Sequence, residues 1–443
     1  MSTDPIDRIA NAPMGRLQMA VVAMTVCLNA LDGFDVLSIS FASPGIAVEW
    51  GIDRAALGIV LSMELMGMAV GSIVLGGVAD KIGRRPTILG CLVLMTAGML
   101  MATTVGSVIE LSIWRLVTGF GIGGMLAAIN AVAAEFSNTR RRHLSVSLMS
   151  IGYPLGAVVG GTVAAQLLRG NGWRAVFYFG AAVTATLTPM VLFIVPESVQ
   201  WLTRRQPTGA LEKINTSLKR MGHPAITALT DLSGDVHGRS PLDIFAPGLV
   251  ATTAIVTLAY FLHITTFYFI VKWVPKIVVD LGFAASSAAG VLVWTNAGGA
   301  LGGTVFGLLT QRYRVKALTI AVLLMSTVTV ALFGRTPADL QRLSLICGAA
   351  GFCTNAGIVG LYAIIAQAFP TDVRAFGTGF TIGVGRGGSV LAPILAGFLF
   401  AAGYSLATVA LAMALGSLLG ASALLLLRFE RKGSLVPDAE RRS

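Results

Sequence analysis

Apolar stretches of about 18 or more residues recur along this chain, each long enough to cross a bilayer as a helix. The chain has 443 residues, of which 12% are charged and 55% hydrophobic, and its mean hydropathy is +0.79. A water-soluble protein of this length needs far more charge to cover its surface. The sequence therefore predicts an all-α membrane protein surrounded by a lipid bilayer.

We expect twelve transmembrane helices arranged as two pseudo-symmetric bundles of six. The predicted spans are 17–43, 55–79, 86–105, 108–136, 144–168, 174–195, 249–273, 286–310, 316–334, 341–368, 376–402 and 404–427. One long polar stretch separates the sixth span from the seventh. The predicted parts are an N-terminal bundle (1–195), a cytoplasmic central loop (196–248), a C-terminal bundle (249–427) and a cytoplasmic tail (428–443).

Basic residues gather in alternate loops and in the tail, and loops of the opposite side carry few. Because cytoplasmic loops are enriched in Lys and Arg, we expect both termini on the cytoplasmic side of the inner (plasma) membrane. Topology also explains the net charge of +11 better than a nucleic-acid partner does. The basic residues of these three loops and of the tail are Lys81, Arg84, Arg85, Arg140, Arg141, Arg142, Arg312, Arg314, Lys316, Arg428, Arg431 and Lys432.

The two halves of the chain repeat each other. A shift of 232 positions brings Gly58 onto Gly290, and the same shift brings Glu64 onto Asn296. Further matches at shifts of 232 or 233 pair Gly67 with Gly299, Gly71 with Gly303, Phe136 with Phe369, Arg141 with Arg374 and Gly152 with Gly385. Parallel six-span repeats are typical of alternating-access transporters, whose substrate site lies between the halves near mid-membrane.

Two acidic residues, Asp32 and Asp35, lie inside the first span. A charged side chain at the bilayer centre costs roughly 2.5–3.5 kcal/mol on insertion scales, so such residues face protein or water and are functional. At positions i and i+3 the two carboxyl groups share one helix face. They repel each other when both are ionised, and burial disfavours charge. We therefore expect the pair to bind protons.

The sequence contains no pattern that predicts a bound cofactor or metal ion. All four cysteines lie in apolar spans, without zinc-ligand or disulfide spacing. Residues 119–124 match the dinucleotide pattern G-x-G-x-x-G, but no strand precedes them and the surroundings are membrane helix. We expect no metal and no cofactor, with the proton gradient as the energy source, and we expect that the protein is not an enzyme.

The loop between the second and third spans carries a glycine, acid and base motif. Residues 76–86 read Gly-Gly-Val-Ala-Asp-Lys-Ile-Gly-Arg-Arg-Pro. This resembles the G-x-x-x-D-[RK]-x-G-R-R signature of the major facilitator superfamily, which implies a twelve-helix transporter. The resemblance makes Gly76, Asp80, Gly83, Arg84 and Arg85 a gating motif.

We expect Asp80 to cap the start of the eleventh span near Gly377 and Thr378, as a latch that stabilises the outward-open state. Arg84 and Arg85 would tie Asp80 to the end of the fourth span. The alternative interpretation is a topology signal without a gating role.

Within this superfamily, Asp32-Gly33-Phe34-Asp35 resembles the D-G-x-D motif of the aromatic acid:proton symporter family. The companion features are Arg115, Glu135 and the run 385–388, Gly-Arg-Gly-Gly. The resemblance implies uptake of a benzoate-like or hydroxybenzoate-like anion together with protons, for catabolism of aromatic compounds. It assigns proton coupling to Asp32, Asp35, Arg115 and Glu135. The chain departs from the family at 311–316, which lacks the usual acid and histidine.

The candidate substrate-binding residues are Arg386, Lys272, His263, Gly33 and Tyr268. Cations suit a carboxylate, aromatic rings suit an aromatic ring, and glycine lets the backbone approach a ligand or its neighbours. An alternative interpretation of the aromatic residues and the lysine in the seventh span is that they anchor the helix at the membrane interface instead of contacting substrate.

The partners expected are a small organic anion and protons, for a protein acting as a monomer. Three other functions remain open. A muconate-like diacid could use two cationic residues, and the run 152–156 loosely resembles the G-x-x-x-G-P motif of drug/proton antiporters. From a different class, the chain could be a non-transporting membrane sensor.

Overall fold

The computed structural model describes residues 4–229, 241–370 and 373–427, which are helical and contain no strand. Twelve of their helices are long and apolar enough to cross a membrane, which confirms the predicted all-α membrane class. The tail 428–443, with Arg428, Arg431 and Lys432, lies outside the described residues, as does part of the central loop. The twelve helices are α2 (Arg16–Trp50), α3 (Arg54–Ile82), α4 (Arg84–Ala102), α5 (Val108–Glu135), α6 (Arg142–Gly170), α7 (Arg174–Ile194), α10 (Val250–Asp280), α11 (Ala285–Leu309), α12 (Val315–Phe333), α13 (Leu340–Ala368), α14 (Arg374–Ala401) and α15 (Leu406–Leu426).

Two helices run past the ends predicted for them. The first and seventh spans were expected to end at residues 43 and 273, which are one and two residues before a proline, but α2 and α10 continue through Pro44 and Pro275. Prolines are tolerated inside membrane helices because neighbouring groups satisfy the freed carbonyls. The chain turns instead at Gly51 (φ 59°) and Gly282 (φ 97°), in the left-handed conformation that suits glycine.

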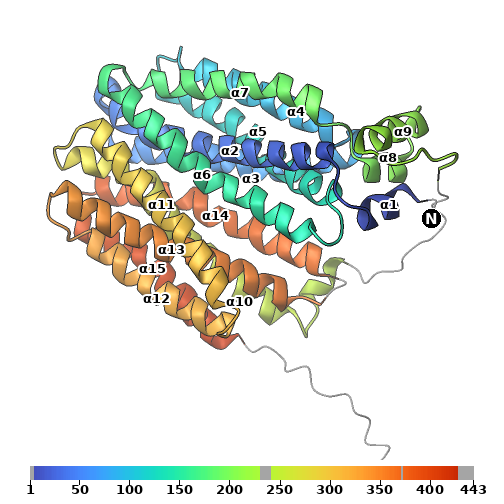
Figure 1. Cartoon of the computed structure of the whole chain (residues 1–443). Helices are drawn as coiled ribbons and strands as arrows, with labels where there is room; N and C mark the ends of the chain where they lie inside the picture. Colours follow the sequence, from blue (N-terminus) through green and yellow to red (C-terminus); the bar gives the residue numbers. More distant parts are fainter. Residues whose placement is uncertain (1–3, 230–240, 371–372, 428–443) are drawn as a thin grey trace, which may run out of the picture.

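The central segment is partly helical, which the polar composition did not reveal. It contains α8 (Val199–Arg205), the amphipathic α9 (Ala210–Met221) and a 3-10 turn, η1 (Pro241–Phe245). With the N-terminal helix α1 (Pro5–Asn11), α8 and α9 lie at one end of the bundle, which we call the α8–α9 end; the opposite end is the far end (Figure 1).

Glycines set the packing of both halves, α2–α7 and α10–α15, in the same way. A Cβ atom at Gly119 would collide with the carbonyl oxygen of Glu64, and one at Gly351 would collide with that of Thr295. These contacts bring α3 against α5 in the first half and α11 against α13 in the second. Small residues allow such close backbone approach in membranes. The repeated contact supports the internal repeat seen in the sequence.

The halves touch each other through α3 and α14, α6 and α11, and α2 and α10. Arg54 forms an ion pair with Asp280 at 3.0 Å, and the Ser62 hydroxyl donates to the Val390 carbonyl at 2.7 Å. The polar contacts that α3 makes with the second half, among the described residues, all lie between Arg54 and Glu64. This part of α3 is remote from the α8–α9 end. The two halves are therefore closed on each other at the far end.

Replacing either packing glycine by alanine should weaken the bundle. We expect Gly119→Ala and Gly351→Ala each to lower the free energy of unfolding by about 1–3 kcal/mol, because the added methyl group meets backbone that cannot move aside. Thermal unfolding of the purified protein in detergent measures the effect. Gly90→Ala in α4 is the matched control, because a Cβ there meets nothing within 4 Å. Equal melting of all three variants would contradict this account of the packing.

Candidate functional site

The acid pair lies in the interior of the bundle. Asp32 and Asp35 are buried, and their four carboxyl oxygens have no hydrogen-bond partner among the described residues. Close packing holds α2 in place, because a Cβ at Gly33 would collide with the carbonyl oxygen of Tyr153 in α6. Gly33 therefore sits against a neighbouring helix. Two buried carboxyl groups without partners are suited to holding protons.

The two acids have different surroundings. The carbonyl oxygen of Asp35 accepts a hydrogen bond from Arg115 Nη2 at 3.0 Å, and Arg115 is the cation whose charge acts on its carboxyl group. For Asp32 the acting cation is Arg386, which comes from the second half of the chain. The cation that acts on Asp35 thus belongs to the same half, and the cation that acts on Asp32 belongs to the opposite half.

Glu64 of α3 is the acidic centre that the sequence analysis missed. Its carboxylate forms an ion pair with Arg115, and its second oxygen lies 3.4 Å from Lys272 Nζ. All three side chains are fully buried. A buried guanidinium stays charged and needs an acidic partner, and Glu64 is that partner for Arg115. The signal in the sequence was the repeat, which aligns Glu64 with the neutral Asn296.

Lys272 and His263, both expected near the substrate, are engaged elsewhere. Lys272 donates to the carbonyl oxygen of Val36 as well as contacting Glu64, so both of its partners belong to the first half. His263 bonds Ser417 Oγ at 2.9 Å and the Thr354 carbonyl at 2.8 Å, inside the second half. Both ring nitrogens of His263 are therefore occupied.

Arg386 is placed by its flanking glycines. A Cβ at Gly385 would collide with the ring of Tyr260, and one at Gly388 would collide with the carbonyl oxygen of Phe261, so α14 packs tightly on α10. Arg386 Nη1 is buried without a hydrogen-bond partner among the described residues. A guanidinium with a free N–H is suited to binding a carboxylate.

Three tyrosines lie close enough to this guanidinium to feel its charge. Its charge acts on Tyr153, Tyr260 and Tyr268, and the Tyr260 hydroxyl lies 3.2 Å from that of Tyr362. Tyr362 itself is 41% exposed. Aromatic faces beside a cation are suited to an aromatic anion.

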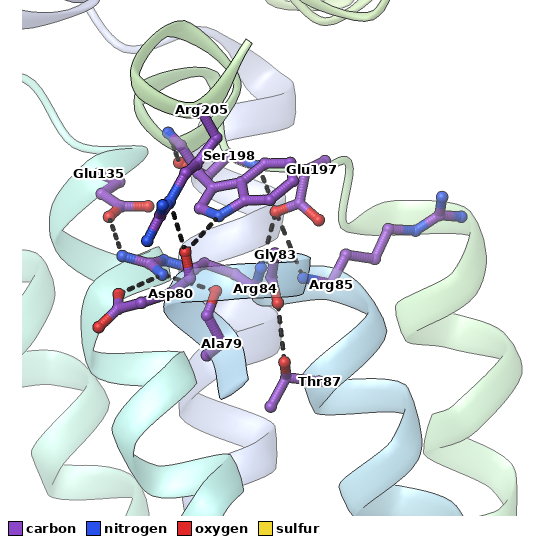
Figure 2. A network of polar contacts seen from close by, with 11 residues as sticks. Ala79, Asp80, Gly83, Arg84, Arg85, Thr87, Glu135, Glu197, Ser198 and Arg205 are labelled. Carbon is purple, nitrogen blue, oxygen red and sulfur yellow. Dashed lines mark hydrogen bonds and ion pairs between the residues drawn. The ribbon is translucent and has the colours of Figure 1, made fainter. Parts of the chain in front are cut away.

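The motif at residues 76–86, for which the sequence predicts a gating role, forms a separate network at the α8–α9 end (Figure 2). Arg84 binds Asp80 at 2.7 Å and Glu135 at 3.3 Å, so Glu135 belongs to this network and not to the acid pair. Gly76 faces Ala127 of α5. The Asp80 carboxylate is 65% exposed and contacts Arg84 of α4, so among the described residues the expected contact with the start of α14 near Gly377 and Thr378 is not formed.

Glu197, which follows α7, anchors the same loop and was also missed from the sequence. Its Oε1 accepts from the backbone N–H of Arg84 at 2.8 Å and of Arg85 at 3.4 Å. A side chain at Gly83 (φ 112°) would collide with the Glu197 carboxylate. Glycine is therefore required there both for its backbone conformation and for space. Arg205 adds a hydrogen bond to the Asp80 carbonyl at 3.0 Å (Figure 2).

Comparison with known proteins identifies the family. The model of the Major Facilitator Superfamily matches residues 25–294 and 256–443. The chain belongs to this superfamily. Its members are transporters rather than enzymes, and the described residues hold no group of three or more His, Cys, Asp or Glu that could bind a metal.

The curated relatives include aromatic acid transporters, as the motifs implied. The chain is 27% identical to a gallate transporter of Pseudomonas putida, over 91% of this chain and 90% of that one. It is 28% identical to a 3-(3-hydroxy-phenyl)propionate transporter of Escherichia coli, over 95% and 96%. A 4-hydroxybenzoate transporter of Pseudomonas putida is 27% identical, over 88% of each chain.

Solved structures share the fold. A D-xylose-proton symporter matches with a TM-score of 0.72 at 18% identity, covering 92% of this chain and 96% of that one. A bacterial homolog of the human lysosomal transporter Spinster, in an inward-facing and unoccupied conformation, matches with a TM-score of 0.70 at 15% identity, covering 93% and 97%.

The stability of the α8–α9 end should depend on the protonation of Glu197. Burial raises the pKa of this carboxyl group above its ordinary value of 4.5, although backbone N–H groups favour the ionised form. Protonation therefore stabilises the folded state, and this contribution is lost as the pH rises from below 4.5 through the raised pKa. Glu197→Gln lacks the dependence, so wild-type stability relative to this variant should fall across that window.

Thermal unfolding of the two proteins over a pH series measures this difference. Glu212→Gln, on the exposed face of α9, is the control and should keep the wild-type profile. Parallel profiles for wild type and Glu197→Gln would contradict the assignment.

Proposed function

We propose that the protein imports an aromatic carboxylate together with protons by alternating access. The observation that carries the proposal is the buried acid pair, whose carboxyl oxygens have no partners, next to a guanidinium with a free N–H. The aromatic acid transporters among its relatives support the substrate class.

Asp32 and Asp35 would carry the protons. Two ionised carboxylates without partners are strongly disfavoured in the membrane interior, so the arrangement suits protonated groups. Protonation also removes negative charge that would repel an anionic substrate at Arg386. Proton binding therefore favours anion binding, and anion binding favours proton binding.

Arg386 would hold the substrate carboxylate, with its aromatic ring among Tyr153, Tyr260 and Tyr268. Arg115 and Lys272 both pair with Glu64, which leaves Arg386 as the cation of this cluster without an ion-pair partner among the described residues. One available cation favours a monocarboxylate over a muconate-like diacid. An anion site also argues against a transporter of drug cations.

We further propose that the α8–α9 end faces the cytoplasm of a cell whose inner membrane holds the protein. The positive loops support this orientation. The far end, which is closed in this conformation, would then face outward, and the structure would represent an inward-facing state. Both termini would be cytoplasmic and the protein would act as a monomer.

Proton coupling is tested by replacing each acid of the pair. We expect Asp32→Asn and Asp35→Asn to reduce proton-driven accumulation of labelled 4-hydroxybenzoate in vesicles to the background of empty vesicles, because neither amide can release a proton. Exchange of labelled for unlabelled substrate across the membrane should persist, since it needs no net proton movement. Asp7→Asn, on the exposed face of α1, is the matched control. Full accumulation by both variants would exclude the coupling role.

Substrate binding is tested by thermal stabilisation of the purified protein, since a ligand of the folded state raises its apparent stability. Benzoate, 4-hydroxybenzoate and gallate should stabilise the wild type, whereas aliphatic diacids and drug cations should not. Arg386→Ala should weaken aromatic-acid binding by about 1.5–3 kcal/mol, or roughly ten- to a hundredfold, the range for a hydrogen bond to a charged group.

Arg374→Ala, an exposed arginine in the first turn of the same helix, should bind like the wild type. Stabilisation by cations alone, or unchanged aromatic-acid affinity of Arg386→Ala, would overturn the assignment of the site.

A further inference from the structure

Glu64 lies between two cations from different halves of the molecule. Arg115 is on α5 in the same half, whereas Lys272 is on α10 in the other. All three side chains are fully buried. Lys272 also donates to the Val36 carbonyl, so its ammonium group reaches across the interface to two helices of the first half. The gating network around Arg84 is at the opposite end of α3 and takes no part in this arrangement.

We propose that Glu64 and Lys272 form a charged latch that holds the far end closed, and that Glu64 is the positioning residue for Arg115. The proposal rests on alternating access, because a latch has meaning only if the far end opens. It does not depend on which anion is carried or on proton coupling.

The position of the pair along α3 supports this role. Arg54 and Asp280 also join the halves, but these side chains are 44% and 27% exposed, and exposed ion pairs contribute little to stability. Glu64 and Lys272 are the innermost of the polar contacts between α3 and the second half. When a buried pair separates, each charge needs a new partner, so the bridge strongly favours the closed arrangement.

The latch also contacts the helix that carries the acid pair. Lys272 binds the carbonyl oxygen of Val36, and Arg115 binds that of Asp35, the preceding residue. Glu64 holds both of these cations. Separation of Lys272 from Glu64 would therefore alter the surroundings of Asp35 at the same time as it frees the far end.

The internal repeat shows that the fold does not require the pair. Pro44 and Pro275 occupy matching places in the two halves, 231 positions apart, and the same shift aligns Lys272 with Phe41. Glu64 aligns with Asn296. The second half packs in the same way with neutral Asn296 in the place of Glu64, and the first half does so with neutral Phe41 in the place of Lys272. The two charges are thus specific to the contact between the halves.

A cysteine at Ser62 can report opening of the far end. Ser62 is fully buried, and its hydroxyl binds Val390 across the interface, so a thiol there should react with N-ethylmaleimide only when the halves separate. The assay uses the full-length protein in nanodiscs without substrate, with the exposed Cys27 replaced by serine. Labelling at each cysteine is followed by peptide mass spectrometry. Native Cys91 and Cys347 are buried within separate halves and report unfolding.

Removing the latch should open the far end. We expect Lys272→Met to increase the labelling rate of Ser62→Cys about tenfold or more, as the closed population falls. Lys272→Arg keeps the charge and should restore slow labelling. Lys276→Met, one turn further along the same helix, is the matched control, because Lys276 pairs within α10 with Asp280. In a Glu64→Gln background, Lys272→Met should add a smaller increase than it does alone, because the ion pair is already lost and only the contact with the Val36 carbonyl remains to be removed.

Other results would overturn the proposal. If Lys272 instead binds substrate, Lys272→Met weakens 4-hydroxybenzoate binding and leaves labelling at the wild-type rate. If Lys272→Met also exposes Cys91 and Cys347, Glu64→Asp decides the question, because it keeps the charge but draws the carboxylate away from Lys272. Faster labelling at Ser62→Cys alone then supports the latch, and wild-type labelling refutes it. If Asp32→Asn and Asp35→Asn leave uptake unchanged, proton coupling is rejected, but the labelling of Ser62→Cys still decides the latch.

Discussion

Charge inside an apolar medium is the constraint on which this structure depends. Three acids and three bases meet in the central described cluster: Asp32, Asp35, Glu64, Arg115, Lys272 and Arg386. Glu64 takes two of the bases. With the aspartates ionised the six charges cancel, and with both protonated the cluster carries two excess positive charges. Proton binding thus makes the cluster attractive to an anion, and electrostatics alone links the two ligands of the proposed transport cycle.

The membrane helices could be predicted because hydrophobic length is a property of each segment alone. All twelve predicted spans correspond to helices in the structure. The predicted ends of α2 and α10 were wrong because proline stops a helix in water more reliably than in a protein-filled membrane. The amphipathic α9 was missed for a related reason. A helix that buries one face against the end of a bundle has the polar composition of a loop.

The site was only partly predictable, because partners come from helices far apart in the sequence. Asp32 and Asp35 stand out from their own segment, where two acids are costly. Glu64 could not be recognised from the sequence as the partner of Arg115, because it is 51 positions away on another helix. Glu197 likewise binds backbone groups more than 110 positions earlier. A spacing pattern finds neighbours on one helix, whereas these contacts exist only once the helices are packed.

The repeat explains the packing, and departures from it mark the chemistry. The glycine contacts of α3 with α5 recur in α11 with α13. The charged residues do not recur: by the shifts that align the helices, Asp32 matches His263, Lys272 matches Phe41 and Arg386 matches Tyr153. The first half thereby holds the proposed proton carriers and the second the proposed anion receptor. In the proposed cycle, a rocking motion between similar halves would change the distance between unlike sites, so the asymmetry of the side chains would give a symmetric fold a means of coupling proton and anion.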